Sequence, residues 1–68
     1  MRDEPEVQRR LAKLLSTLRH YHGELELAEL NGFDFVAQSA RREIRNHQDV
    51  IRRICEAAGL PVPPEVWR

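Results

Sequence analysis

The sequence has a single cysteine, no excess charge of either sign and no long apolar run, and each absence excludes a class of protein. Because Cys55 is alone, the 68-residue chain forms no disulfide within itself and no zinc site from paired thiolates. Eleven basic residues balance eleven acidic ones, whereas a dedicated DNA-binding arm is strongly basic. The short apolar runs cannot span a membrane, and the first residues lack the apolar segment of a signal peptide. We therefore expect a cytoplasmic protein without a membrane contact.

The length of the chain limits what its core can do. A chain of 68 residues has room for one small domain, and such domains bury only about 60% of their unfolded surface. Small domains are usually stabilised further by disulfides, a structural metal or oligomerisation. Since the cysteine count excludes the first of these, we expect association with a second chain to supply the missing burial.

Apolar residues recur with helical spacing in two stretches of the sequence. In each stretch the spacing alternates between three and four residues, which is typical of a helix packed along one antiparallel partner. The first seam contains Val7, Leu11, Leu14, Leu18, Tyr21, Leu25 and Ala28, and the second contains Ala37, Ala40, Ile44, His47, Ile51, Ile54 and Ala58. The sequence therefore predicts an all-α fold, an antiparallel two-helix hairpin.

Residues that start and stop helices set the limits of the two stretches. Asp3 and Asp34 are suited to the N-cap positions of the two helices. Asn31 and Gly32 tolerate the left-handed conformation that ends a helix, and so does Gly59. We predict a hairpin domain over residues 1–59, with helices over about 4–30 and 35–58 and a turn over 31–34.

Two features interrupt this simple pattern. Gly23 lies within the first helix, where we expect a bend in an otherwise continuous element. Residues 60–68 contain Pro61, Pro63 and Pro64, which predict a stiff extended tail. We expect Trp67 near its end to pack on the open end of the bundle, and the alternative is that it docks on another protein.

Further apolar residues lie beside the two seams and widen them beyond what one partner helix covers. We therefore predict that two hairpins dimerise into a four-helix bundle, and the alternative is a monomer whose tail folds over the flank. The predicted dimer interface consists of Leu15, Leu27, Leu30, Phe35, Val36, Val50 and Cys55.

Charge is distributed along the length of the hairpin. Arg9, Arg10, Lys13, Arg52 and Arg53 lie near the open end, and Glu24, Glu26 and Glu29 lie near the turn. Head-to-tail packing of two hairpins brings acidic ends against basic ends, so we expect the dimer to be antiparallel.

His47 is a polar residue in an apolar seam. A single polar seam residue commonly sets the register or the oligomeric state of a helical assembly, which is the role we predict. The alternative is a metal site formed by His22, Glu43 and His47. Carboxylate-bridged metal bundles use a Glu-x-x-His spacing on paired helices, whereas this chain has Glu-x-x-x-His once. We therefore expect no metal and no other cofactor.

No catalytic motif is present in the sequence, and we expect the protein not to be an enzyme. The preferred hypothesis is a small homodimeric protein-interaction module with a regulatory or adaptor role. The alternative is a bundle that binds RNA or DNA through Arg41, Arg45 and Arg52, which share one side of the second helix. Asp49 interrupts that stripe, and no aromatic residue for base stacking is near it in the sequence.

Overall fold

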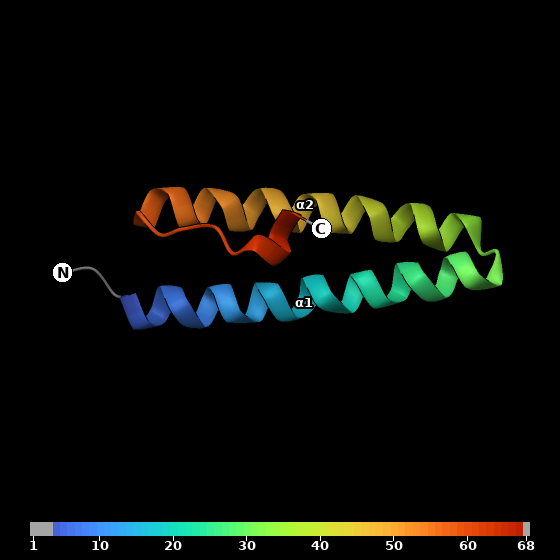
Figure 1. Ribbon diagram of the computed structural model, residues 1–68, viewed down its shortest axis with the longest axis horizontal. Helices are drawn as coiled ribbons and strands as arrows, with labels where there is room; N and C mark the ends of the chain where they lie inside the picture. The colour runs from blue at the N-terminus through green and yellow to red at the C-terminus, as the bar shows by residue number, and fades with distance from the viewer. Residues whose placement is uncertain (1–3, 68) are drawn as a thin grey trace.

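The computed structural model describes residues 4–67 and shows a hairpin of two long helices (Figure 1). Helix α1 spans Glu4–Asn31, helix α2 spans Asp34–Ala58, and a short 3-10 helix, η1, spans Pro64–Trp67. The two α-helices run antiparallel and pack side by side along a molecule of 49 × 17 × 16 Å. The prediction of an all-α two-helix hairpin is thus confirmed. Neither helix within residues 4–67 combines the length and the apolarity that crossing a bilayer requires.

Helix α1 continues without interruption through Gly23. The predicted N-cap, Asp3, lies outside the described residues. Apart from its chain neighbours and the backbone of its own helix, a Cβ atom placed on Gly23 would meet nothing within 4 Å, so no close approach of another segment requires the glycine. Its neighbours are good helix formers, and the free energy that one glycine costs is small against the packing of the whole helix.

Glycines with positive φ end both α-helices. Gly32 has φ 71°, and the N–H of Phe33 donates to the carbonyl of Ala28 at 2.9 Å. Gly59 has φ 69°, and the N–H of Leu60 donates to the carbonyl of Cys55 at 2.8 Å. Both ends have the hydrogen bond of a Schellman motif, which satisfies a carbonyl that the helix leaves without a partner.

The start of α2 differs from the prediction by one residue. Phe33 occupies the N-cap position without a side-chain cap, and Asp34 lies inside the first turn. The prediction of Asp34 as the N-cap was therefore wrong. The carboxylate nevertheless suits this place, because the exposed N–H groups of a first turn favour negative charge.

The predicted seams form the interface between α1 and α2. Every seam residue is buried or half-buried, and Leu18 and Ile51 are almost completely enclosed. The buried alanines of the seam, Ala28, Ala37 and Ala40, lie in the half near the turn, and Leu11, Leu18 and Ile51 are buried in the half near the open end. The main cluster of buried residues consists of Leu11, Leu18, Ile44, Ile51, Cys55 and Val66.

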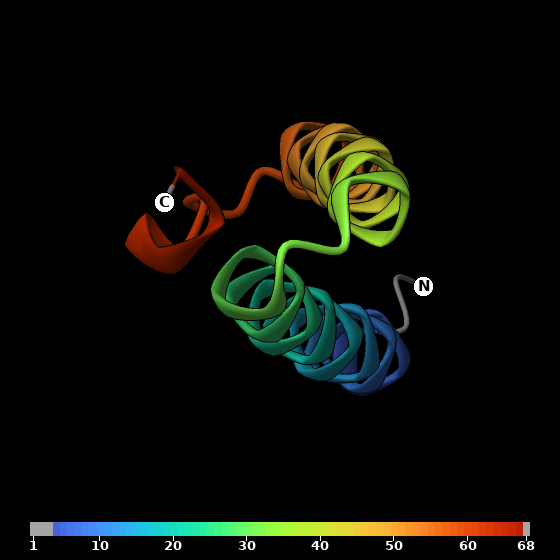
Figure 2. The same cartoon turned by 90° about the vertical axis from the view of Figure 1, so that its right-hand side faces the viewer.

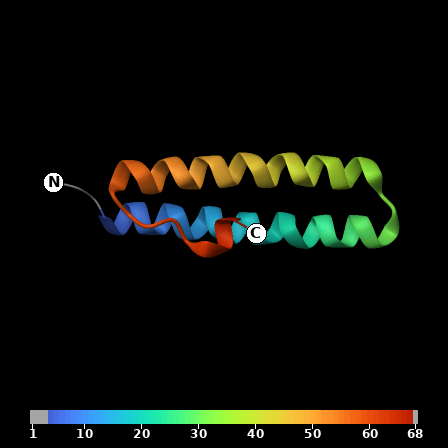
Figure 3. The ribbon, with the colours of Figure 1, turned by 45° about the horizontal axis from the view of Figure 1, so that its top comes forward.

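The tail, residues 60–67, folds back onto the hairpin. After Gly59 the chain reverses and runs along the two helices toward their middle (Figure 3). Seen from the end, η1 lies to one side of the helix pair (Figure 2). Val66 anchors it with an exposed fraction of 0%, whereas Trp67 is 58% exposed. The tail therefore adds a buried side chain to the core of a chain that has few.

Candidate interaction surface

The tail is held against both helices by polar contacts. Arg19 of α1 donates from Nε and Nη2 to the two carboxylate oxygens of Glu65, at 2.8 and 3.0 Å. Gln48 of α2 donates from Nε2 to the backbone carbonyl of Val66 at 2.7 Å. Because these residues come from both helices, the tail lies across one side of the hairpin, here called the tail side, and reaches from the open end toward the middle (Figure 1, Figure 3).

The tail removes Cys55 from the surface. This residue, predicted to lie in a dimer interface, has an exposed fraction of 0% within the single chain, so it offers no surface to a second hairpin while the tail is in place. Leu15, from the same predicted interface, is half-buried and lines a hollow of about 260 Å³ with Leu60 and Pro61. The tail thus covers part of the apolar flank that the sequence assigned to a second hairpin.

Burial also determines the chemistry of the cysteine. Removal from water raises the pKa of the Cys55 thiol, and the nearby Glu56 carboxylate raises it further. A thiol reacts as its thiolate, so a raised pKa and an enclosed sulfur make Cys55 a packing residue rather than a nucleophile.

Within residues 4–67, no segment covers the opposite side of the hairpin in this way. In both helices, each residue is rotated by about 100° about the helix axis relative to the one before it. In α1, Arg19 directly follows the buried Leu18 and faces the tail, so a residue that follows a buried seam residue lies on the tail side. Residues that directly precede a buried seam residue therefore face the other side. Val50 precedes Ile51 and Val36 precedes Ala37, and both valines are exposed. We call this side, with Val36, Val50 and the half-buried Leu14, Tyr21, His47 and Ile54, the uncovered face.

His47 contributes to the uncovered face. Its ring lies against that of Tyr21, with the centroids 5.4 Å apart. Its Nδ1 lies 2.8 Å from the backbone carbonyl oxygen of Glu43 and 3.9 Å from the Glu43 carboxylate. The imidazole is therefore held by its own helix and by Tyr21, with 20% of the side chain exposed.

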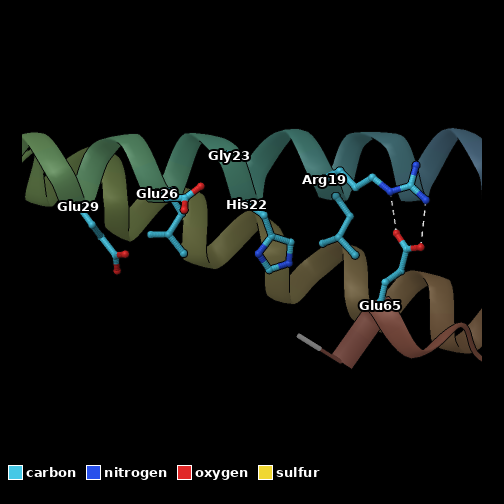
Figure 4. A pocket seen from close by; sticks show the side chains of 8 residues that line it. Arg19, His22, Gly23, Glu26, Glu29 and Glu65 are labelled. Atoms are coloured by element: carbon cyan, nitrogen blue, oxygen red, sulfur yellow. Dashed lines mark hydrogen bonds and ion pairs between the residues drawn. The ribbon is translucent and has the colours of Figure 1, made fainter.

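His22 does not join His47. It lines a hollow of about 660 Å³ on the tail side with Arg19 and Glu65 (Figure 4). Its Nε2 is enclosed there and has no hydrogen-bond partner within the described chain. Residues 4–67 contain no group of three or more His, Cys, Asp or Glu side chains that is able to hold a metal ion. The alternative of a metal site formed by His22, Glu43 and His47 is therefore contradicted, because the two histidines lie on different sides of the hairpin.

The remaining residues of the predicted dimer interface lie near the turn. Leu27 directly precedes the buried Ala28 and so lies toward the uncovered face. Leu30 and Phe35 each lie two residues from a buried alanine and point away from the seam. Phe35 is 80% exposed. The structure thus separates the predicted interface into a lateral part and an outward-facing part.

The arginines proposed for nucleic-acid binding have different partners. Arg41 donates to the carboxylate of Glu29, and Arg52 donates to that of Asp49, each at 2.8 Å. Arg45 lines a hollow of about 370 Å³ with Arg52 and Trp67. No aromatic residue lies near these arginines in the sequence of α2. In the fold, the tail brings Trp67 beside Arg45 and Arg52.

Comparison with known proteins adds no family to this description. No family model, curated protein or solved structure matches the chain.

Proposed function

We propose that this chain is a self-associating helical hairpin with a regulatory or adaptor role, which acts by binding rather than by catalysis. The observation that carries the proposal is the asymmetry of the hairpin's two sides. The tail covers part of one side, from the open end toward the middle (Figure 3), while the other side exposes Val36 and Val50 beside the half-buried Tyr21 and His47. A second copy on the uncovered face would complete a four-helix bundle and bury these side chains.

Charges beside the uncovered face support a head-to-tail arrangement of the two copies. Arg10 and Glu24 each lie seven residues from Thr17, on the same side of α1. Arg10 borders a hollow at the open end together with Val7 and Ile54. In an antiparallel pair centred on Thr17, Arg10 of each copy meets Glu24 of the other. A parallel pair would place like charges together, so the charges favour the antiparallel orientation although exposed pairs add little affinity.

The same centre suits α2. Tyr21 of α1 packs against His47 of α2. About one helical turn nearer the open end, α1 carries Thr17 and α2 carries Val50. Thr17 and Val50 therefore lie at about the same level of the hairpin. A two-fold axis at this level places Val50 of one copy near Val50 of the other, so an exposed apolar residue lies at the centre of the proposed interface.

The mass of the protein in solution tests this proposal. We expect light scattering or sedimentation over a series of micromolar concentrations to show a dimer that dissociates on dilution. Val50→Asp should abolish the dimer, because it places a charge at the centre of the interface. Leu30→Asp is the matched control, since Leu30 points away from the seam and the dimer should persist. A wild-type monomer throughout the series would contradict the proposal.

The orientation has a separate test. Arg10→Glu and Glu24→Arg should each weaken the dimer, and the double variant should restore it, because the exchange re-forms both pairs with reversed polarity. Glu24 also lies 3.4 Å from Nε2 of His20, so Glu24→Arg changes a contact within its own chain as well. For this reason both single variants are measured beside the double variant. If the wild-type protein is a dimer and none of the three variants changes the dissociation constant of that dimer, this orientation is excluded.

A further inference from the structure

The outer side of α2 carries a continuous line of hydrogen-bond donors. One hollow of about 400 Å³ is lined by Gln38, Arg41, Arg42, Arg45 and Asn46. A second, of about 370 Å³, is lined by Arg45, Asn46, Gln48, Asp49, Arg52 and Trp67. Because the two hollows share Arg45 and Asn46, they form one shallow trough, here called the arginine trough. It ends at an exposed aromatic ring.

The charge of the arginine trough is positive. It contains four arginines and one carboxylate, that of Asp49. Asp49 is engaged by Arg52 at 2.8 Å and by Arg53 at 3.0 Å, and Arg41 is engaged by Glu29. Within residues 4–67, Arg42 and Arg45 form no ion pair with a carboxylate. Their guanidinium groups are therefore available to an anion from outside the chain.

Contacts of the residues that precede Trp67 hold its backbone in a defined position. The backbone carbonyl of Val66 accepts a hydrogen bond from Gln48, and Val66 itself is completely buried. Glu65 is fixed to Arg19 by two hydrogen bonds. Trp67, the residue that follows these two anchors, is thus held beside α2, yet it remains 58% exposed. An exposed indole whose backbone is fixed offers a stacking surface at low cost in conformational entropy.

We propose that the arginine trough binds single-stranded nucleic acid, with a base stacked on Trp67 and the phosphates along Arg45 and Arg42. Arginines, which contact phosphates, and an aromatic ring, which accepts the face of any base, are the two components of single-strand binding sites. The amides of Gln38 and Asn46 add donors and acceptors for base edges. The trough lies away from the uncovered face, so a dimer presents it twice. The inference does not depend on self-association.

Direct titration tests the proposal. The probes are an oligouridine RNA and an oligodeoxyuridine DNA of about 12 nucleotides, which differ only in the sugar, and inorganic polyphosphate serves as a polyanion without bases. We expect the RNA or the DNA to quench the fluorescence of Trp67, the only tryptophan, and the binding constant to fall steeply as NaCl rises. Polyphosphate should bind without the stacking signal. Which of the two oligonucleotides binds more tightly identifies the natural sugar.

Two substitutions separate stacking from charge. Trp67→Ala should weaken oligonucleotide binding about tenfold, and Trp67→Phe should retain most of it. Arg45→Ala should weaken binding to the RNA, the DNA and polyphosphate alike and reduce the salt slope by about one. Phe35→Ala and Arg9→Ala are the matched controls, because both side chains are exposed outside the trough, and neither should matter.

Several outcomes would overturn the proposal. Equal binding of polyphosphate and oligonucleotide, without a change in Trp67 fluorescence, would show that the trough is only a positively charged surface. Unchanged affinity of the Arg45→Ala variant would place any binding elsewhere on the chain. Because Arg45 and Trp67 are exposed, circular dichroism should confirm that each variant remains folded, and the two variants give independent answers.

Discussion

Arg19 and Glu65, 46 residues apart in the sequence, form a two-pronged ion pair that holds the tail on the hairpin. The hydrogen bonds measure 2.8 and 3.0 Å. They raise the pKa of the Arg19 guanidinium, first through hydrogen bonding and then through the charge of Glu65. The guanidinium fork matches the geometry of a carboxylate, which gives the pair an orientation as well as an attraction. The pair therefore directs where the tail lies, while Val66 supplies the buried surface.

Reversal of one charge of this pair should loosen the tail. In Arg19→Glu, two carboxylates face each other, and we expect the fluorescence anisotropy of Trp67 to fall and proteolysis within residues 60–67 to accelerate. The double variant Arg19→Glu/Glu65→Arg should recover the wild-type values. High salt should mimic the single variant in part, because the pair is exposed to solvent. Unchanged anisotropy in the single variant would show that the pair does not position the tail.

Truncation of Val66 should destabilise the whole hairpin. Val66→Ala removes two methyl groups from a fully enclosed site, and we expect the free energy of unfolding in urea to fall by about 2 kcal/mol. Val62→Ala is the control, because Val62 is only half-buried and should cost less. Equal small losses in both variants would mean that the tail does not belong to the cooperative core.

Replacement of glycine by alanine should change the free energy of unfolding in opposite directions at different positions. Gly23 lies within α1 with open space around the position of a Cβ atom, so Gly23→Ala should raise the free energy of unfolding by about 0.5–1 kcal/mol. Gly32→Ala and Gly59→Ala should lower it by about 1 kcal/mol each, because both residues have positive φ. Thermal and urea denaturation measure all three. A loss of stability in Gly23→Ala would reveal a need for the glycine that the open space does not explain.

The thiol of Cys55 should be inert until the chain unfolds. We expect a thiol reagent to label it slowly in buffer and rapidly in urea, since the sulfur is enclosed. The raised pKa of Cys55 also predicts that the free energy of unfolding decreases at alkaline pH. Above the ordinary thiol pKa of about 8.5 the unfolded chain loses the proton first, so the free energy of unfolding falls until the pH passes the raised value. Cys55→Ala should lack this part of the pH dependence, and rapid labelling of the native protein would contradict the burial.

Much of the hairpin followed from local patterns, and the seam residues show why. Their alternating spacing requires a helix with one buried stripe, and this requirement is independent of what covers the stripe. The ends of the helices were equally local, because Gly32 and Gly59 adopt a conformation that disfavours most other residues. The one error of position, at Asp34, amounts to a single residue at a helix start, where side-chain capping competes with other ways to close the turn.

The placement of the tail could not be read in this way. Its prolines predicted an extended segment, but residues 64–67 form a 3-10 helix. The sequence also contains no periodicity that selects one side of the hairpin. That choice depends on Arg19 and Gln48, which lie far from Glu65 and Val66 in the chain. For the same reason neither the enclosure of Cys55 by the single chain nor the proximity of Trp67 to Arg45 was foreseen.

The sequence by itself thus determined the two helices, their ends and their shared seam, because a helix buries the same stripe whatever its partner. Only the tertiary structure decided that Cys55 is enclosed, that His22 and His47 lie on different sides, and that an indole ring joins the arginines of α2. These relationships arise from contacts between distant residues, which compete with one another and with water. Within residues 4–67 they place the tail over part of one face (Figure 3) and leave the other face without such a cover, and that asymmetry was not encoded in any local pattern.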